Sequence, residues 1–430
     1  RGLGDVYKRQ GGTGTDEETA ARTALDRAGR DQGWVDFDDL VVLAADVLDT
    51  HPDVAEAWRG RFSHILADEF QDVDEQQYRL LRLLAGDGGN LCVIGDPYQA
   101  IYGFRGADAA CFQRFAADYP AAPTLRLSRN YRSSGTIVSA AAAVIGAPAD
   151  GITRAMGEPV TIHAAADAAA EADFVAATIE ELLGGHDMLA ANRTRSSRGA
   201  LGFGDCAVLY RTDAQAAAFR AAFDRAGIPF RKSSPAAIAT HPGVLAVLDT
   251  LDGAEGADLA ARVRVAAETA RGQGTDPAAV AEAAGWLTTL AASDAVAGDP
   301  ARLREEVALS TEADFHDARA DRVSLLTMHA AKGLEFANVF VAGLESGLMP
   351  FSWDAEPDET TLAEERRLFY VAATRARDRL FLTRAGERVW RGTARTLAPS
   401  PFLAAVPAEL SRTSGSVERK RRRTQQLSLF

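Results

Sequence analysis

The sequence predicts an α/β protein with two parallel-sheet cores and a helical insertion in the second core. Short apolar runs, typical of buried parallel strands, alternate with helical periodicity in both halves of the chain. Residues 232–321 are instead Ala-rich and helical throughout. The chain has 430 residues, 47% of them hydrophobic. That length suggests roughly two to four domains.

Charge and cysteine content exclude several classes of protein. The net charge of −13 argues against a wholly basic nucleic-acid coat, although a local basic groove stays compatible with it. Cys92, Cys111 and Cys206 lie far apart, so we expect neither a disulfide framework nor a zinc site, and a reducing cytoplasm fits. No signal peptide is visible, and no apolar run approaches the roughly 20 residues that span a membrane, so we expect no membrane partner.

Residues 65–107 hold the most informative pattern. A short apolar run ends in Asp68-Glu69, and a helical segment and a second apolar run, residues 91–94, follow. Adjacent carboxylates at the carboxyl end of a buried strand are costly unless they have a function. One can hold Mg²⁺ through water while its neighbour orients an attacking water. The alternative is a pair of buried strands whose acidic turns are only structural.

Motifs along the chain resemble those of one family. DEFQD at residues 68–72 and GDPYQAIYGFRGA at residues 95–107 resemble motifs II and III of superfamily 1 DNA helicases of the UvrD/PcrA/Rep group. NYRS at residues 130–133, TMHAAKGLEF at residues 327–336 and EERRLFYVAATRARDRLFL at residues 364–382 resemble motifs IV, V and VI. Because the motifs occur in family order, the resemblance is specific over roughly the last two-thirds of such an enzyme.

The resemblance implies two RecA-like cores, a partial domain 1A and a domain 2A, with a short helical 2B insertion. We expect a linker and remnant of 1B (1–33, of which residues 1–10 are candidates for foreign sequence), the C-terminal part of 1A (34–125), the first part of 2A (126–231), the 2B-like insertion (232–321), the second part of 2A (322–407) and a disordered basic tail (408–430). A short strand is predicted at residues 125–127.

A phosphate loop is missing from the sequence. The glycine-rich residues 11–15 do not fit GxxxxGK[ST], which needs a lysine directly after its last glycine. None of the lysines follows a glycine; they are Lys8, Lys232, Lys332 and Lys420. We therefore expect an N-terminally truncated helicase that hydrolyses ATP poorly by itself.

The resemblance also assigns catalytic roles with ATP and Mg²⁺ as cofactors. Asp68 is the Mg²⁺ residue, Glu69 is the general base for water, and Gln99 senses the γ-phosphate. Arg132 and Arg375 reach that phosphate from the second core, where a guanidinium matches the charge that spreads over it. For Arg375 the alternative is a surface charge among the other arginines of its helix.

Further residues are assigned to the nucleoside and to DNA. The resemblance places Tyr131 on the adenine and Glu335 on the ribose. The DNA-binding candidates are Tyr102, Phe104, Arg105, Arg129 and His329. Aromatic faces can stack on bases for roughly 1–3 kcal/mol each, although the family usually has Trp at the position of Phe104. A lone histidine is more often structural, and His329 is a candidate only through its motif.

The function that follows is an ATP-dependent 3′→5′ helicase or translocase on single-stranded and forked DNA, in repair or replication. A non-catalytic pseudo-helicase that binds DNA or a partner is the alternative, and the intact set of catalytic residues argues against it. A RecB-like helicase–nuclease subunit is disfavoured because few residues follow motif VI.

The last residues resemble a partner-binding peptide. QLSLF, at residues 426–430, resembles the pentapeptide QLxLF that binds the bacterial sliding clamp. The partner-binding candidates are Gln426, Leu427, Leu429 and Phe430. The basic run at residues 419–423 would add attraction to DNA. The alternative is an ordinary frayed tail.

Overall fold

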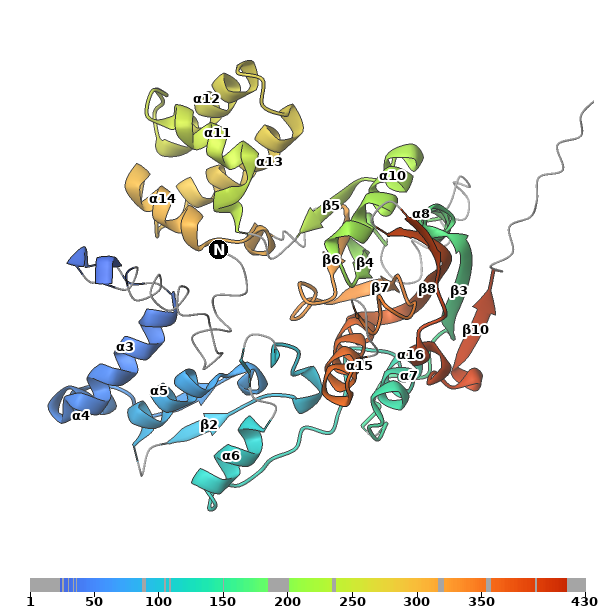
Figure 1. Ribbon diagram of the computed structural model, residues 1–430, viewed down its shortest axis with the longest axis horizontal. Coiled ribbons are helices and arrows are strands. Elements are labelled where there is room, and N and C mark those ends of the chain that lie inside the picture. Colours follow the sequence, from blue (N-terminus) through green and yellow to red (C-terminus); the bar gives the residue numbers. More distant parts are fainter. Residues whose placement is uncertain are drawn as a thin grey trace, which may run out of the picture. The chain divides into compact units, whose positions relative to one another are not determined.

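The computed structural model describes residues 24, 27–29, 31–33, 35, 37–86, 90–103, 106–107, 110–149, 151–184, 201–233, 237–315, 321–352, 357–390 and 393–415. These residues form α/β structure with parallel sheets, as predicted. The chain divides into two compact units, drawn in Figure 1. Unit 1 comprises Arg1–Ala155 and Pro350–Thr374, and unit 2 comprises Met156–Met349 and Arg375–Phe430. No helix in the described part of the chain is long and apolar enough to cross a membrane.

Unit 1 contains a parallel pair of strands among helices. Its elements are α3 (Phe37–Thr50), α4 (Pro52–Arg59), β1 (Ile65–Ala67), η1 (Phe70–Asp72), α5 (Glu75–Ala85), β2 (Leu91–Val93), η2 (Pro97–Gln99), α6 (Cys111–Asp118), α7 (Gly135–Ile145) and α15 (Glu359–Ala373). Strands β1 and β2 pair with Ile65 opposite Leu91. Helix α5, which connects them, begins with a capping box between Asp74 and Gln77.

The core beneath β1 and β2 is aromatic. Phe70 is fully buried and meets the rings of Tyr78, Phe112 and Phe115 edge to face, at centroid distances of 5.9, 5.3 and 5.8 Å. Such pairs stabilise a core beyond the area that they bury. Because Phe70 directly follows Glu69 in the sequence, this packing anchors the acidic turn.

The boundary of unit 1 differs from the expected boundary at residue 125. Residues 126–155, which include motif IV, and helix α15 both belong to unit 1. The reason is packing: α7 lies against α15, and Asn130 forms a bridge with Ile152. The strand predicted at residues 125–127 is wrong. Leu125 and Leu127 are 88% and 94% exposed, and no strand pairs with them in the described residues.

Unit 2 is built on a parallel sheet. Its strands are β3 (Val160–Asp167), β4 (Cys206–Tyr210), β5 (Phe230–Ser233), β6 (Val323–Thr327), β7 (Phe336–Val341), β8 (Ala376–Trp390), β9 (Thr393–Thr396) and β10 (Ser411–Ser414). Among the described strands the order is β10-β3-β8-β7-β4-β6-β5, with β9 antiparallel to β8. Strands β4, β6 and β7 are buried along their whole length, which explains their continuous apolar sequence.

Helices of two kinds complete unit 2. Helices α8 (Ala168–Leu182) and α10 (Ala216–Ala226) pack on one another and share a core with the sheet. Helices α11 (Pro242–Leu251), α12 (Leu259–Gly272), α13 (Pro277–Ala291) and α14 (Pro300–Leu309) have an apolar core of their own. Figure 1 shows α11 to α14 gathered together, away from the strands. The predicted helical character of this stretch is confirmed.

The tail begins later than expected. Residues 408–414, expected to be disordered, form η8 (Ala408–Leu410) and β10. Strand β10 pairs with β3 from Ser411 opposite Val160, and Arg412 Nε donates to Thr161 Oγ1 over 3.0 Å. The polar composition of this segment favours disorder, but its pairing with β3, which is far away in the sequence, makes it a strand. Residues 416–430 lie outside the described residues.

A buried ion cluster joins three elements of unit 2. Arg388 lies between Glu171 and Glu345, and its Nε is 2.7 Å from Glu345 Oε2. Glu171 Oε1 also accepts hydrogen bonds from Thr383 Oγ1 at 2.6 Å and from Gly343 N at 3.1 Å. Burial raises the pKa of Glu345, while the guanidinium of Arg388 lowers it. Each buried charge is thus paired and hydrogen-bonded, the condition under which such charges are tolerated.

Candidate functional site

The acidic turn of unit 1 has a strained backbone. Strand β1 ends at Ala67, and Asp68 and Glu69 follow it. Glu69 has a φ of 51°, in the left-handed region that non-glycine residues rarely occupy. Asp68 Oδ1 accepts a hydrogen bond from Glu69 N over 2.9 Å. A backbone of this kind costs about 1–3 kcal/mol and is typical of functional sites.

Gln71 connects this turn to the loop after β2. Its side chain is buried, with Nε2 donating to Glu69 Oε2 over 2.6 Å and Oε1 accepting from Asp96 N over 2.9 Å. Gly95 makes room for it, because a Cβ there would lie 2.2 Å from Gln71 Oε1. The carboxylate of Glu69 is therefore held in one direction.

Asp96 extends the connection to Gln99. Its Oδ2 accepts from Gln99 Nε2 over 2.9 Å, and its Oδ1 accepts from Tyr98 N over 2.9 Å, which caps η2. A continuous chain of hydrogen bonds thus runs from Glu69 through Gln71 and Asp96 to Gln99. It joins the predicted base to the predicted phosphate sensor at the carboxyl ends of two adjacent parallel strands, the edge at which α/β sheets bind ligands.

Gln71 and Gly95 were missed as site residues in the sequence. The signal was present, since Gln71 lies within DEFQD and Gly95 opens GDPYQ. A glutamine beside two carboxylates has no obvious role until the tertiary structure shows which groups it joins.

The chemistry of Asp68 fits a magnesium nucleotide. Asp68 is exposed at the carboxyl edge of β1, and carboxylate oxygen is the ligand type that Mg²⁺ prefers. The described residues hold no cluster of three or more His, Cys, Asp or Glu side chains that could bind a metal by itself. One carboxylate supplemented by substrate phosphates and water is the usual arrangement for Mg²⁺ in nucleotide sites.

The motif IV residues also belong to unit 1. Asn130 Oδ1 accepts hydrogen bonds from Arg132 N and Ser133 N, at 3.0 and 3.1 Å, which shapes the turn. Tyr131 is 69% exposed, and Arg129 and Arg132 are exposed too. We expected Arg132 in the second core; the structure assigns it to the same unit as Glu69.

Arg375 and Glu335 belong to unit 2. Arg375 is only 2% exposed, and its Nη1 donates to the carbonyl oxygen of Leu334 over 3.3 Å. Glu335 pairs with Arg377 at 3.7 Å between Oε1 and Nη1. A surface charge, the alternative for Arg375, is excluded by its burial. The structure brings Arg375 and the Leu334–Glu335 backbone together within one unit.

His329, in the same unit, is uncharged at neutral pH. It is partly buried, and burial lowers its pKa to about 3, with the nearby charge of Arg211 acting in the same direction. The folded chain therefore favours the neutral form of His329.

The structure describes only part of the remaining predicted site residues. Tyr102 is partly buried in the loop after η2. Phe104 and Arg105 lie outside the described residues, as do Gln426, Leu427, Leu429 and Phe430.

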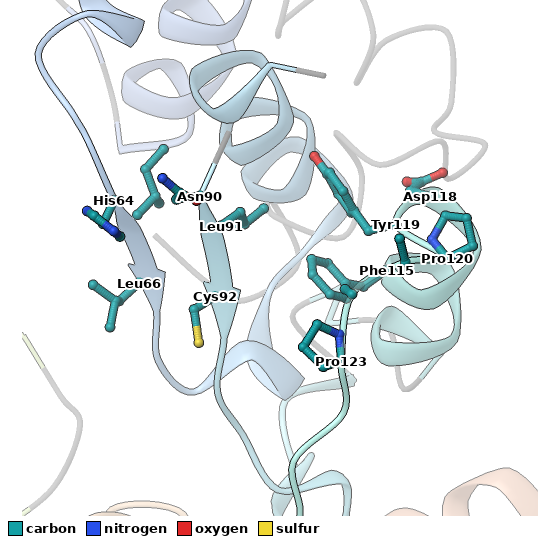
Figure 2. A pocket seen from close by; sticks show the side chains of 13 residues that line it. His64, Leu66, Asn90, Leu91, Cys92, Phe115, Asp118, Tyr119, Pro120 and Pro123 are labelled. Carbon is teal, nitrogen blue, oxygen red and sulfur yellow. The ribbon is translucent and has the colours of Figure 1, made fainter. Parts of the chain in front are cut away.

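An open groove of about 650 Å³ lies near the opposite end of β1 and β2. Figure 2 shows His64 just before β1, Leu66 on β1 and Cys92 on β2, while Phe115, Tyr119 and the prolines after α6 lie on the other side of β2. None of the predicted site residues that the structure describes lines this groove.

The parallel sheets define an α/β protein, a class in which ligands bind beyond the carboxyl ends of the strands. The model of the UvrD/REP helicase N-terminal domain matches residues 8–120. The model of the UvrD-like helicase C-terminal domain matches residues 125–239 and 295–387. The chain therefore belongs to the UvrD/Rep helicase family, whose domains have RecA-like cores.

Curated relatives agree with the family. The chain is 31% identical over 478 residues to the ATP-dependent DNA helicase PcrA of Leuconostoc citreum, covering 89% of this chain and 62% of that protein. It is 30% identical over 483 residues to DNA helicase II of Escherichia coli K12, covering 91% of this chain and 64% of that protein. The chain thus spans less than two-thirds of the length of these relatives. A solved structure, the C-terminal domain of a possible DNA helicase from Lactobacillus plantarum, is 15% identical, with a TM-score of 0.32, and the match covers 66% of this chain and 98% of that one.

Proposed function

We propose that this protein acts as an ATP-dependent helicase or translocase that moves 3′→5′ on single-stranded or forked DNA, in repair or replication. One observation carries the proposal: the hydrogen-bonded chain from Glu69 through Gln71 and Asp96 to Gln99, at the carboxyl edge of β1 and β2, in a member of a DNA helicase family. The direction of movement rests on the resemblance alone. ATP and Mg²⁺ are the proposed cofactors.

Asp68, Glu69 and Gln99, at the carboxyl edge of β1 and β2, have different roles in the proposed hydrolysis of ATP. Asp68 would hold Mg²⁺, which would supply the positive charge that neutralises the phosphates. Glu69 accepts a proton from the attacking water, while Gln71 keeps its carboxylate oriented. Gln99 donates from its carboxamide to the γ-phosphate. Positioning of this kind is the main contribution a protein makes to phosphoryl transfer.

Other residues contact the γ-phosphate, the nucleoside of ATP and the DNA. Arg132 and Arg375 stabilise the negative charge on the γ-phosphate, Tyr131 offers an exposed ring to adenine, and Glu335 bonds the ribose. DNA contacts come from Tyr102, Phe104, Arg105, Arg129 and His329. With a net charge of −13, the chain depends on such local groups to attract a polyanion.

A second proposed partner is the bacterial sliding clamp. The residues that would bind it are Gln426, Leu427, Leu429 and Phe430, whose pattern matches QLxLF. Apolar side chains in a strongly polar segment favour a role in binding a pocket on a partner.

The test is phosphate release from Mg-ATP with and without single-stranded DNA. We expect little turnover from this chain alone, because none of its lysines follows a glycine. Joined behind a segment that carries a GxxxxGK[ST] phosphate loop, the chain should show DNA-stimulated turnover. It should also unwind duplexes with a 3′ tail in preference to those with a 5′ tail.

Glu69→Gln decides whether the acidic edge is catalytic. In the joined protein this change should lower turnover by at least about 100-fold, because the general base is lost, and should leave ATP binding intact. The matched control is Glu75→Gln, an exposed glutamate in the first turn of α5. Ordinary turnover from the chain alone would contradict the expected need for a phosphate loop, and unchanged turnover in Glu69→Gln would contradict the role of Glu69 as general base. Absence of DNA-stimulated turnover in the joined protein would favour a non-catalytic DNA-binding protein.

A further inference from the structure

Helix α15 contacts η2 and the loop after it at three places, all within unit 1. Arg367 Nε donates to the carbonyl oxygen of Ala100 over 2.7 Å. The ring of Tyr370 lies 6.0 Å from that of Tyr98, at 58°. Glu364 approaches Gly103 so closely that a Cβ there would lie 1.8 Å from its Oε1.

These three side chains form one face of the helix. Glu364, Arg367 and Tyr370 are spaced three residues apart, so they lie above one another on α15. Along this face Glu364 meets Gly103, Arg367 meets Ala100 and Tyr370 meets Tyr98. The stretch from Tyr98 to Gly103 also includes Gln99 and Tyr102. Helix α15 therefore packs against the part of unit 1 that includes Gln99, the predicted phosphate sensor, and Tyr102, a predicted DNA contact.

The hydrogen bond from Arg367 is the strongest of these contacts. Ala100 and Ile101 are 7% and 3% exposed, and a buried carbonyl needs a donor. Arg367 is itself half-buried; burial lowers its pKa, and the negative charge of Glu364 opposes that effect. Burial in turn raises the pKa of Glu364, which the charge of Arg367 opposes. A charged donor in such surroundings makes a stronger hydrogen bond than a neutral one.

We propose that Arg367 is a positioning residue that holds the loop from Tyr98 to Gly103 in place, and with it the side chains of Gln99 and Tyr102. Arg367 itself touches neither nucleotide nor DNA. The roles of Gln99 and Tyr102 in this loop rest on the proposed function. The positioning role of Arg367 is independent of that function.

The choice of residue types supports this role. A planar guanidinium has a donor at Nε in a fixed direction, which the point charge of a lysine cannot reproduce. Gly103 allows the close approach of Glu364, because the carboxylate of Glu364 occupies the space that a Cβ at residue 103 would need.

Hydrogen exchange of the whole chain tests the holding role directly. In Arg367→Ala, amides of residues 100–103 should exchange about tenfold faster, as expected for loss of a hydrogen bond from a charged donor. Arg367→Lys should not restore protection. The matched control is Arg302→Ala, an exposed arginine of α14, which should change nothing. Exchange in α5 should stay unchanged in each variant, which excludes general unfolding. Unchanged exchange at residues 100–103 in Arg367→Ala would overturn the proposal.

Binding of a fluorescent oligo(dT) shows whether the loop matters for DNA. Affinity should fall about tenfold in Arg367→Ala, with the dependence of log K on log salt unchanged. A residue that contacts a phosphate would lower that slope by about one, and lysine would substitute for it. That pattern would also overturn the proposal. If the unchanged chain does not bind DNA, the proposed function fails, while hydrogen exchange still decides the role of Arg367.

A pair of substitutions tests the close approach independently. Gly103→Ala should speed exchange of the loop because its Cβ collides with the carboxylate of Glu364. Adding Glu364→Ala should return exchange toward that of Glu364→Ala alone, since the space is then free. Effects that simply add would show that the two residues are not coupled and would contradict the arrangement.

Discussion

Gln71 donates from Nε2 to Glu69 Oε2 across 2.6 Å, although only Phe70 separates the two residues in the sequence. The left-handed backbone of Glu69 makes this possible, because it turns the chain back on itself after β1. The same glutamine accepts from Asp96 N. One buried carboxamide therefore ties the acidic turn to the neighbouring strand.

Gln71→Ala should destabilise the chain and loosen Glu69. Two partners lose a partly buried hydrogen bond, so the free energy of unfolding should fall by about 1 kcal/mol. Urea unfolding followed by circular dichroism measures the change. Gln113→Ala, at an exposed position of α6, is the control and should be neutral. Equal stability of the two variants would show that the hydrogen bonds of Gln71 contribute nothing.

Acid should destabilise the chain partly through His329. Its pKa is lowered to about 3 in the folded chain, so between that value and about 6.5 only the unfolded chain binds the proton. The free energy of unfolding therefore falls as the pH falls through this window, by about 2 kcal/mol from this group at pH 5. His329→Gln should remove that part of the pH dependence. His64→Gln, at an exposed histidine, should keep it. Parallel curves for wild type and His329→Gln would contradict the prediction.

Arg388→Leu should be among the most destabilising single changes in unit 2. It leaves Glu171 and Glu345 buried without their shared cation, which costs about 3–5 kcal/mol in comparable cases. Arg388→Lys, which keeps the charge, should lose less. Arg220→Leu, on the exposed side of α10, is the control for loss of charge. Chemical unfolding of the variants supplies the values, and similar losses for Arg388→Leu and Arg220→Leu would argue against the cluster.

A peptide of residues 424–430 should bind the bacterial sliding clamp. Short motifs of this kind bind in the micromolar range, roughly −8 kcal/mol. Fluorescence anisotropy with purified clamp should show saturation. Leu429→Ala with Phe430→Ala should abolish binding, whereas Ser428→Ala, at the variable position of the pattern, should not. A peptide that fails to saturate, or a double variant that binds as well, would rule out this partner.

Sequence reasoning succeeded where the signal was local. The strands that lead to Asp68 and Asp96 were predicted from apolar runs, and the helical stretch that holds α11 to α14 was predicted from its composition. It failed at residues 125–127, because apolar composition alone does not supply a partner strand. It also failed at residues 408–414, where a polar segment pairs with β3.

The sequence by itself determined the α/β class, the acidic residues at the ends of parallel strands and the helical stretch of unit 2. Each of these depends on periodicity or residue chemistry within a short window. Only the tertiary structure decided that Gln71 joins Glu69 to Asp96, that motif IV belongs to unit 1, and that Arg367 holds Ala100, 267 residues away along the chain. Such contacts depend on how distant segments pack, and no local pattern records which partner a buried donor will meet.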